Sequence, residues 1–145
     1  MVPFVDLNAQ YKSIKAEIDF VISDVIEKSS FVRGHYVEKF EQMFAGTMDR
    51  KYCVSCANGT DSLYIAMVAL GVEPGDEVIA PAHSWISTTE TITQAGGRVV
   101  FCDTEENTFT IDPMSIEEKI TSKTVGIIPV HLYGHPADMD PIMSI

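Results

Sequence analysis

Hydrophobic residues recur with two different periods along this chain, and the period changes after the first third. Over residues 9–28 the apolar positions fall three or four apart, which predicts a helix with one buried stripe. The stripe consists of Ile14, Ile18, Val21, Ile22, Val25 and Ile26. Residues 31–34 break this pattern, and a second helix is expected to follow and to end near Gly46. Its apolar face carries Val37, Phe40, Met43 and Phe44.

These two helices precede every predicted strand. Their position favours a helical N-terminal arm, residues 1–46, that lies over the rest of the chain or over a partner subunit. An ordinary helical hairpin packed on the chain's own core explains the same periodicity equally well.

From residue 51 onward, short apolar runs alternate with helical patterns. The expected strands are residues 51–57, 77–81, 98–102 and 124–130, and the expected helices are residues 60–70, 87–94 and 113–120. Asp112 and Pro113 read as an N-cap followed by proline at the first helical position, and Asp140 with Pro141 reads the same way. Such alternation predicts an α/β fold with a largely parallel sheet and helices on both faces.

Composition fits a soluble globular protein, with 46% hydrophobic and 21% charged residues in a chain of 145. We therefore expect the chain to be one domain's worth in size, with the arm followed by an α/β part over residues 47–145. The net charge of −11 argues against nucleic acid or an anionic membrane surface as the main partner. No apolar run approaches the roughly 18 residues of a membrane span, and no basic and apolar leader opens the chain, so a cytoplasmic location is expected.

The three cysteines, Cys53, Cys56 and Cys102, form an odd set that does not suggest a secreted disulfide framework. Cys53 and Cys56 form a C-x-x-C pair, and His131 with His135 raises the possibility of a zinc site. The two pairs lie much farther apart than in a zinc finger. In a strand, moreover, residues three apart point to opposite faces, so the sequence disfavours zinc.

Gly59 and Thr60 lie where the predicted strand 51–57 meets the next helix. A glycine and a hydroxyl residue there place free backbone N–H groups, a side-chain donor and the positive end of the helix dipole at one point. This arrangement predicts an anion site, most simply for a phosphate group. The alternative is that Asn58 or Thr60 only caps the helix and Gly59 only makes the turn.

Other candidate residues follow other predicted strands, where the ligands of open α/β sheets bind. His83 and Trp85 come after strand 77–81, and His131 and Tyr133 come after strand 124–130. A tryptophan on a polar loop beside a phosphate site can stack on a flat aromatic ligand, although a lone tryptophan is also a common core or interface anchor. His131 and His135 equally suit structural hydrogen bonds near a turn.

Several motifs run in register over nearly the whole chain. They are FVRG at 31–34, VEKFE at 37–41, NGTDSL at 58–63, PGDEVI at 74–79, PAHSW at 81–85, IPVHLYG at 128–134 and DMD at 138–140. Together they resemble the start of a DegT-type sugar aminotransferase. The resemblance implies a pyridoxal-phosphate (PLP) enzyme with the aspartate-aminotransferase fold. It also implies conversion of a nucleotide-linked keto-sugar to an amino sugar, with an amino-acid donor, glutamate, in polysaccharide or antibiotic-sugar biosynthesis.

The same resemblance implies roles for individual residues. Gly59 and Thr60 would hold the cofactor phosphate, Trp85 would stack on the pyridine ring, and His131 would lie at the cofactor's edge with Tyr133 beside it. The family pattern is a homodimer with shared active sites. It assigns Phe31, Arg33, Gly34 and Tyr133 to the substrate or the partner subunit.

The resemblance also implies that residues 1–145 are a single partial domain, because it leaves two functional groups unplaced. Such enzymes use a lysine that forms a Schiff base and a carboxylate beside the pyridine nitrogen, and in the family both follow the DMD segment. None of this chain's lysines matches the family's Schiff-base position, so these residues alone are not expected to transaminate.

Three alternatives stay open. A truncated paralogue would serve as a dimerisation or regulatory module, and a same-fold sugar dehydratase would carry histidine in place of the lysine. An unrelated nucleotide-binding α/β protein is weakened by the lack of a G-x-G-x-x-G motif.

Overall fold

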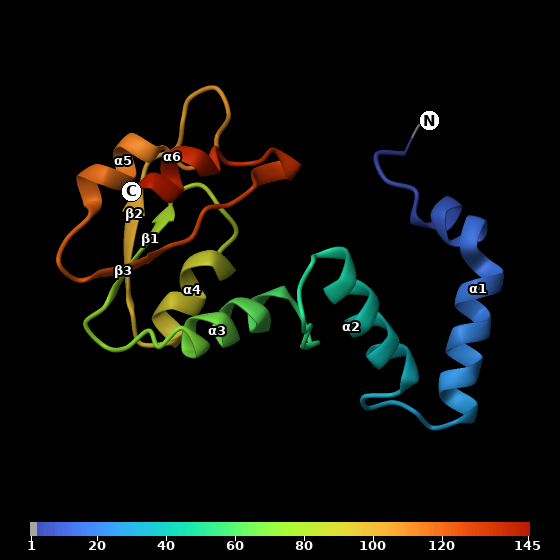
Figure 1. Cartoon of the computed structure of the whole chain (residues 1–145). Coiled ribbons are helices and arrows are strands. Elements are labelled where there is room, and N and C mark those ends of the chain that lie inside the picture. The colour runs from blue at the N-terminus through green and yellow to red at the C-terminus, as the bar shows by residue number, and fades with distance from the viewer. Residues whose placement is uncertain (1–2) are drawn as a thin grey trace. The chain divides into compact units, whose positions relative to one another are not determined.

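The computed structural model describes residues 3–145. Contacts between residues divide the chain into two compact units, with the boundary along the sequence between Ser55 and Cys56 (Figure 1). Among the described residues no helix has both the length and the apolar character needed to cross a membrane.

The first unit holds two helices, α1 (Leu7–Glu27) and α2 (His35–Thr47). Asp6 caps α1 by accepting a hydrogen bond from the Ala9 N–H at 2.9 Å. The Tyr36 hydroxyl of α2 donates to the Asp24 carboxylate of α1 at 3.1 Å. Both predicted helices are therefore confirmed, with ends shifted by one or two residues.

The predicted stripe on α1 is not buried. Its isoleucines Ile14, Ile18, Ile22 and Ile26 are all exposed, and no residue of α1 is buried. The expectation of a buried stripe is wrong for this unit. Among its described residues α2 is the only other helix, and α2 buries just one of its own residues, Ala45. Phe40 and Phe44 stack on each other along α2 with ring centroids 5.5 Å apart, and both are exposed.

Residues 51–57 form no strand, which contradicts the prediction. A strand requires a neighbouring backbone to pair with its N–H and C=O groups, and no strand among residues 3–145 lies beside this segment. Tyr52 and Val54 are accordingly exposed. The strand argument against a zinc site at Cys53 and Cys56 falls with this prediction. Within residues 3–145, no three metal-binding side chains gather in one place.

The second unit is built on a parallel three-stranded sheet in the order β2-β1-β3. Its strands are β1 (Glu77–Pro81), β2 (Arg98–Cys102) and β3 (Thr124–Ile127). The central position Ile79 pairs with Val100 of β2 and Ile127 of β3. Strand β3 ends three residues earlier than predicted. The Ile128 N–H still donates to the Ile79 carbonyl at 2.8 Å, but Pro129 has no N–H to continue the ladder.

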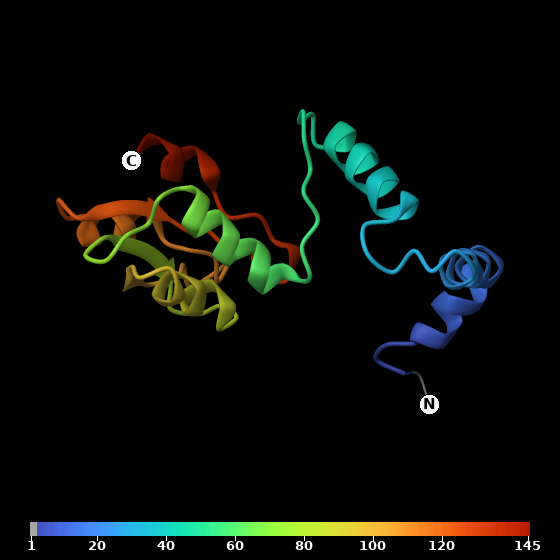
Figure 2. The same ribbon diagram turned by 90° about the horizontal axis from the view of Figure 1, so that it is seen from below.

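Helices cover both faces of this sheet (Figures 1 and 2). One face carries α3 (Gly59–Ala69) and α4 (Ser87–Gln94), and the other carries α5 (Pro113–Lys119) and α6 (Met139–Ser144). Side chains of β1 alternate between the two layers. Val78 and Ala80 pack in the α3 and α4 layer, whereas Ile79 packs in the other. The predicted α/β fold with helices on both faces of a parallel sheet is confirmed.

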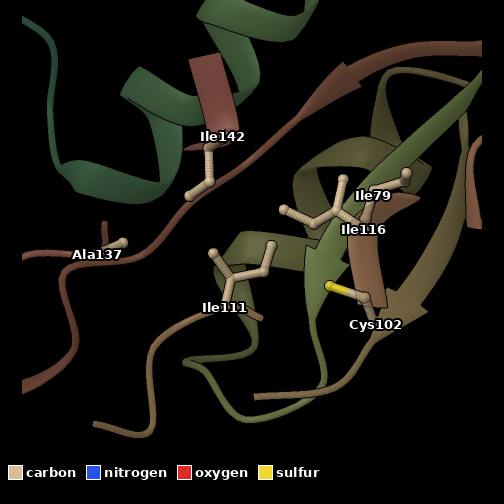
Figure 3. Close-up of a cluster of buried hydrophobic side chains, with 6 residues drawn as sticks. All are labelled: Ile79, Cys102, Ile111, Ile116, Ala137 and Ile142. Carbon is tan, nitrogen blue, oxygen red and sulfur yellow. The ribbon is translucent and has the colours of Figure 1, made fainter. Parts of the chain in front are cut away.

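Figure 3 shows the core beneath α5 and α6. Its buried residues are Ile79, Cys102, Ile111, Ile116, Ala137 and Ile142. The Cys102 thiol is 2% exposed and donates to the Ala80 carbonyl, with 3.6 Å between sulfur and oxygen. Burial, followed by the nearby Asp112 and Asp103 carboxylates, raises the pKa of Cys102 to about 11, so this cysteine packs as a neutral thiol.

Of the two predicted helix starts that contain proline, one is confirmed and the other is wrong. Asp112 caps α5 by accepting from the Met114 N–H at 2.9 Å, and Pro113 is the first helical residue, as predicted. The same interpretation of Asp140 and Pro141 is wrong, because α6 begins at Met139 after Asp138 as N-cap. Pro141 is tolerated there because the N–H groups of the first helical turn have no partner within the helix.

Glu77 joins the starting ends of all three strands. Its side chain is nearly fully buried and forms an ion pair with Arg98 of β2. The Thr121 hydroxyl, just before β3, donates to the other carboxylate oxygen at 2.7 Å. The Arg98 guanidinium, followed by the Thr121 hydroxyl, lowers the pKa of Glu77 below its ordinary value.

A Glu77→Gln variant is expected to melt at a lower temperature at pH 7, by roughly 5 °C. Because folding lowers this pKa, the carboxylate stabilises the fold above the unfolded value of about 4.3. That contribution disappears as the pH falls through the folded-state pKa. Thermal melts of both proteins from pH 7 to pH 3 should therefore converge in acid. Glu117→Gln, at an exposed position on α5, is the matched control. A gap of equal size at pH 7 and pH 3 would contradict this role.

Candidate functional site

The N-terminus of α3 carries its own cap. Asn58 is the N-cap, and its side-chain oxygen accepts from the Asp61 N–H at 2.9 Å. The Asn58 amide group returns a bond to the Asp61 carboxylate at 3.1 Å. The capping interpretation is thus right for Asn58. It leaves the Thr60 hydroxyl available for another partner.

The cap leaves donors free at the helix start. Gly59 and Thr60 are the first two residues of α3, and the N–H groups of both have no protein acceptor within residues 3–145. A Cβ built on Gly59 would meet no atom within 4 Å, so the space beside this residue is open. Two unpaired N–H groups at the positive end of a helix favour an anion. The Asp61 carboxylate, which accepts from the Asn58 amide, opposes that preference because it is negatively charged.

The start of a second helix meets this point. The oxygens of the Thr60 and Ser87 hydroxyls lie 2.7 Å apart, and Ser87 is the first residue of α4. Ser87 is only 7% exposed. The contact therefore brings the N-terminal ends of two helices together after the carboxyl end of β1. This is where parallel sheets bind their ligands.

Trp85 lies two residues before Ser87, on the loop between β1 and α4. Its carbonyl accepts from the Thr88 N–H at 3.0 Å, which fixes the backbone of this turn. The side chain is 77% exposed, so Trp85 is no core anchor of this unit. Trp85 is two residues from Ser87, which contacts Thr60 at the start of α3. An exposed indole on this loop suits stacking on a planar ligand, and an interface role is compatible with the same exposure.

The loop after β2 brings one aromatic residue that the sequence did not indicate. The rings of Phe109 and His83 lie 6.4 Å apart at an interplanar angle of 52°. Phe109 is exposed and has a φ of 59°, which is uncommon for a residue with a bulky side chain. A single aromatic residue in a polar loop has no periodic signal, so only the tertiary contact identifies it.

His131 and Tyr133 lie in the segment after β3. His131 accepts a hydrogen bond at Nδ1 from the Ala137 N–H at 3.0 Å, so it performs the structural role weighed from the sequence. Tyr133 is 89% exposed and has a φ of 54°. No hydrogen bond or ring contact joins either residue to Thr60 or Trp85 among residues 3–145, so their place at a cofactor's edge stays a prediction.

Phe31, Arg33 and Gly34 belong to the first unit, between α1 and α2. Phe31 and Arg33 are exposed. A Cβ on Gly34 would lie 3.0 Å from the Cβ of Ser30, so close packing within the turn explains this glycine. Their assignment to substrate or partner subunit stays a prediction.

The motifs and this geometry agree with a comparison of the whole chain. A family model described as the DegT/DnrJ/EryC1/StrS aminotransferase family matches residues 12–145. The chain belongs to this family.

Two curated relatives match nearly the whole chain. The chain is 45% identical over 144 residues to a pleiotropic regulatory protein of Geobacillus stearothermophilus, covering 99% of this chain and 39% of the relative. It is 43% identical to the UDP-2-acetamido-2-deoxy-3-oxo-D-glucuronate aminotransferase of Pseudomonas aeruginosa, covering 100% of this chain and 40% of that enzyme.

A solved structure confirms the fold. The crystal structure of NtdA from Bacillus subtilis with bound cofactor PMP aligns with a TM-score of 0.92 and 37% identity, over 99% of this chain and 33% of NtdA. The chain thus has the fold of fold-type I aminotransferases. It spans about two fifths of the length of the curated relatives it matches.

Proposed function

We propose that this chain forms the phosphate-holding and ring-stacking part of a PLP-dependent aminotransferase that converts a nucleotide-linked keto-sugar to an amino sugar. The observation that carries this proposal is the Thr60 to Ser87 contact, which places the open N-terminus of α3 beside the Trp85 loop. Family membership supports it independently.

The residues present fit the cofactor's phosphate. A phosphate monoester offers only acceptor oxygens and carries up to two negative charges, so it requires donors and a positive potential. Gly59 and Thr60 supply two N–H groups and a hydroxyl, and the missing side chain of Gly59 leaves room for the approach. Trp85 supplies an exposed planar surface for the pyridine ring. When bound, the cofactor would supply the electron sink and carry the amino group.

In this proposal the site residues of the chain bind or orient the cofactor. Gly59 and Thr60 hold the phosphate, Trp85 holds the ring plane, and His131 with Tyr133 lines the cofactor's edge. The lysine and the carboxylate that the chemistry needs would come from residues outside these 145. Consistent with this, the chain spans about two fifths of its relatives' length.

The substrate and partner assignments rest on the family. The Pseudomonas relative is named for a nucleotide-linked 3-oxo sugar, which supports that substrate class here. We further propose glutamate as amino donor, a cytoplasmic location and a homodimer with shared active sites, to which Phe31, Arg33 and Gly34 contribute. The Geobacillus relative is named as a regulatory protein, and that name favours a second candidate, a regulatory or dimerisation module.

Trp85 provides the test, because it is the only tryptophan in the sequence and its fluorescence reports on that site alone. Titration with PLP is expected to quench the emission, and pyridoxal without phosphate is expected to bind about tenfold more weakly or worse. The 145-residue chain is expected to bind without transferring an amino group from glutamate. Absence of quenching by PLP would contradict the cofactor role and favour the regulatory candidate.

A further inference from the structure

We infer that Ser87 is a positioning residue that holds the Thr60 hydroxyl in the orientation needed to donate to a phosphate group. The inference rests on the proposed function and deepens it, because Ser87 itself contacts Thr60 rather than the ligand. Nothing in the sequence motif indicates this role, since the two residues lie 27 positions apart.

The partner of Thr60 is held firmly by a buried part of α4. Ser87 is 7% exposed, and the Thr91 hydroxyl, which is fully buried, donates to the Ser87 carbonyl at 2.9 Å. One residue on, the oxygens of the Thr88 and Ser84 hydroxyls lie 2.8 Å apart, which ties the helix start to the loop. Ser87 is therefore a fixed point, whereas Thr60 lies at the partly exposed start of α3.

Proton counting gives the contact a direction. Each hydroxyl has one proton, and in the 2.7 Å contact either oxygen can act as the donor. A phosphate offers only acceptors, so a Thr60 hydroxyl that donates to it must accept from Ser87 instead. The bound state then contains a chain in which Ser87 donates to Thr60 and Thr60 donates to a phosphate oxygen. Consecutive hydrogen bonds of this kind strengthen one another.

Ser87→Ala removes the donor and leaves Thr60 free to rotate. The 145-residue chain carrying S87A is expected to bind PLP about fivefold more weakly than the parent chain. Its affinity for pyridoxal, which has no phosphate, should stay within about twofold. Equilibrium dialysis with each ligand measures both constants without requiring turnover. A purely structural role would weaken both ligands equally, so the ratio of the two dissociation constants is the deciding readout.

A double-mutant cycle with Thr60→Val tests whether Ser87 acts through Thr60. Valine keeps the branched shape of threonine and lacks its hydroxyl. In the T60V background, S87A is expected to cause no further loss of PLP affinity. Thr89→Val is the matched control, because the Thr89 hydroxyl donates to the Ile86 carbonyl at 3.1 Å and to no other acceptor within residues 3–145. It should bind both ligands as the parent does.

The outcomes separate this inference from the proposed function. If the parent does not prefer PLP to pyridoxal, the proposed function fails and the inference fails with it. If the parent shows the preference and S87A keeps it unchanged, only the role of Ser87 is overturned. Equal losses for both ligands, or an undiminished S87A effect in the T60V background, would also overturn it. Thermal melts show whether each variant is folded. T60V alone should weaken PLP binding whether or not Ser87 has the positioning role.

Discussion

Gly59→Ala is expected to fold as stably as the parent and to lose about tenfold or more in affinity for PLP. The first helical residue of α3 has open space where the new methyl group would lie, so the fold meets no clash. Alanine is also the better helix former. A ligand that uses the Gly59 N–H must approach through that space, and a weakened charged hydrogen bond costs about 1.5–3 kcal/mol. Thermal melting and equilibrium dialysis with PLP test the two halves of this prediction separately.

Gly46→Ala is the matched control. This glycine is also helical, and a Cβ there also meets nothing within 4 Å, but it lies in α2 and outside the proposed site. The control should bind PLP as the parent does. Unchanged PLP affinity in Gly59→Ala would show that no ligand approaches Gly59. A large loss of thermal stability would show that the open space has been misassigned.

Ile79→Ala is expected to destabilise the second unit by about 3 kcal/mol. Ile79 is 0% exposed, lies at the middle of the central strand, and belongs to a buried cluster with residues of β2, α5 and α6 (Figure 3). Its removal opens a cavity below both helices, and the rigid sheet on the other side limits how far neighbours can relax. Urea unfolding followed by circular dichroism measures the change.

Ile65→Ala makes the same chemical change on α3, at a position that is 52% exposed. Its expected effect is within about 0.5 kcal/mol, because little apolar surface is lost and alanine favours helix. Similar destabilisation by both variants would mean that the core assignment drawn from burial is wrong.

Elements with complete local signals were predictable to the residue. The predicted bounds are correct for strands 77–81 and 98–102 and for helix 87–94. A short apolar run or a helical pattern between turn residues indicates such an element without tertiary information. The start of α5 was predicted equally well, because an N-cap residue followed by proline favours a helix start through interactions within one turn. The Asp140 and Pro141 pair shows the limit of that signal, because proline is tolerated at more than one position of a first turn.

The candidate site was predictable in part. The Gly59 and Thr60 pair and the exposed Trp85 were indicated by residue type at strand and helix ends. Ser87 and Phe109 were missed because their relevance lies in contacts with residues that are distant in the sequence. His131 was indicated, yet its observed bond is to the backbone of Ala137.

The sequence by itself determined the α/β fold class, the capped start of α5 and the family, because periodicity, capping and motif spacing are properties of neighbouring residues. The tertiary structure alone decided which apolar faces are buried and which extended segments become strands. Residues 51–57 have a strand pattern but no paired backbone, and the stripe of α1 has the right spacing but no cover. Burial and strand pairing each require a second surface, and the chain's local pattern does not specify where that surface lies. The contact between Thr60 and Ser87 arises in the same way, from two helices that the sheet brings together.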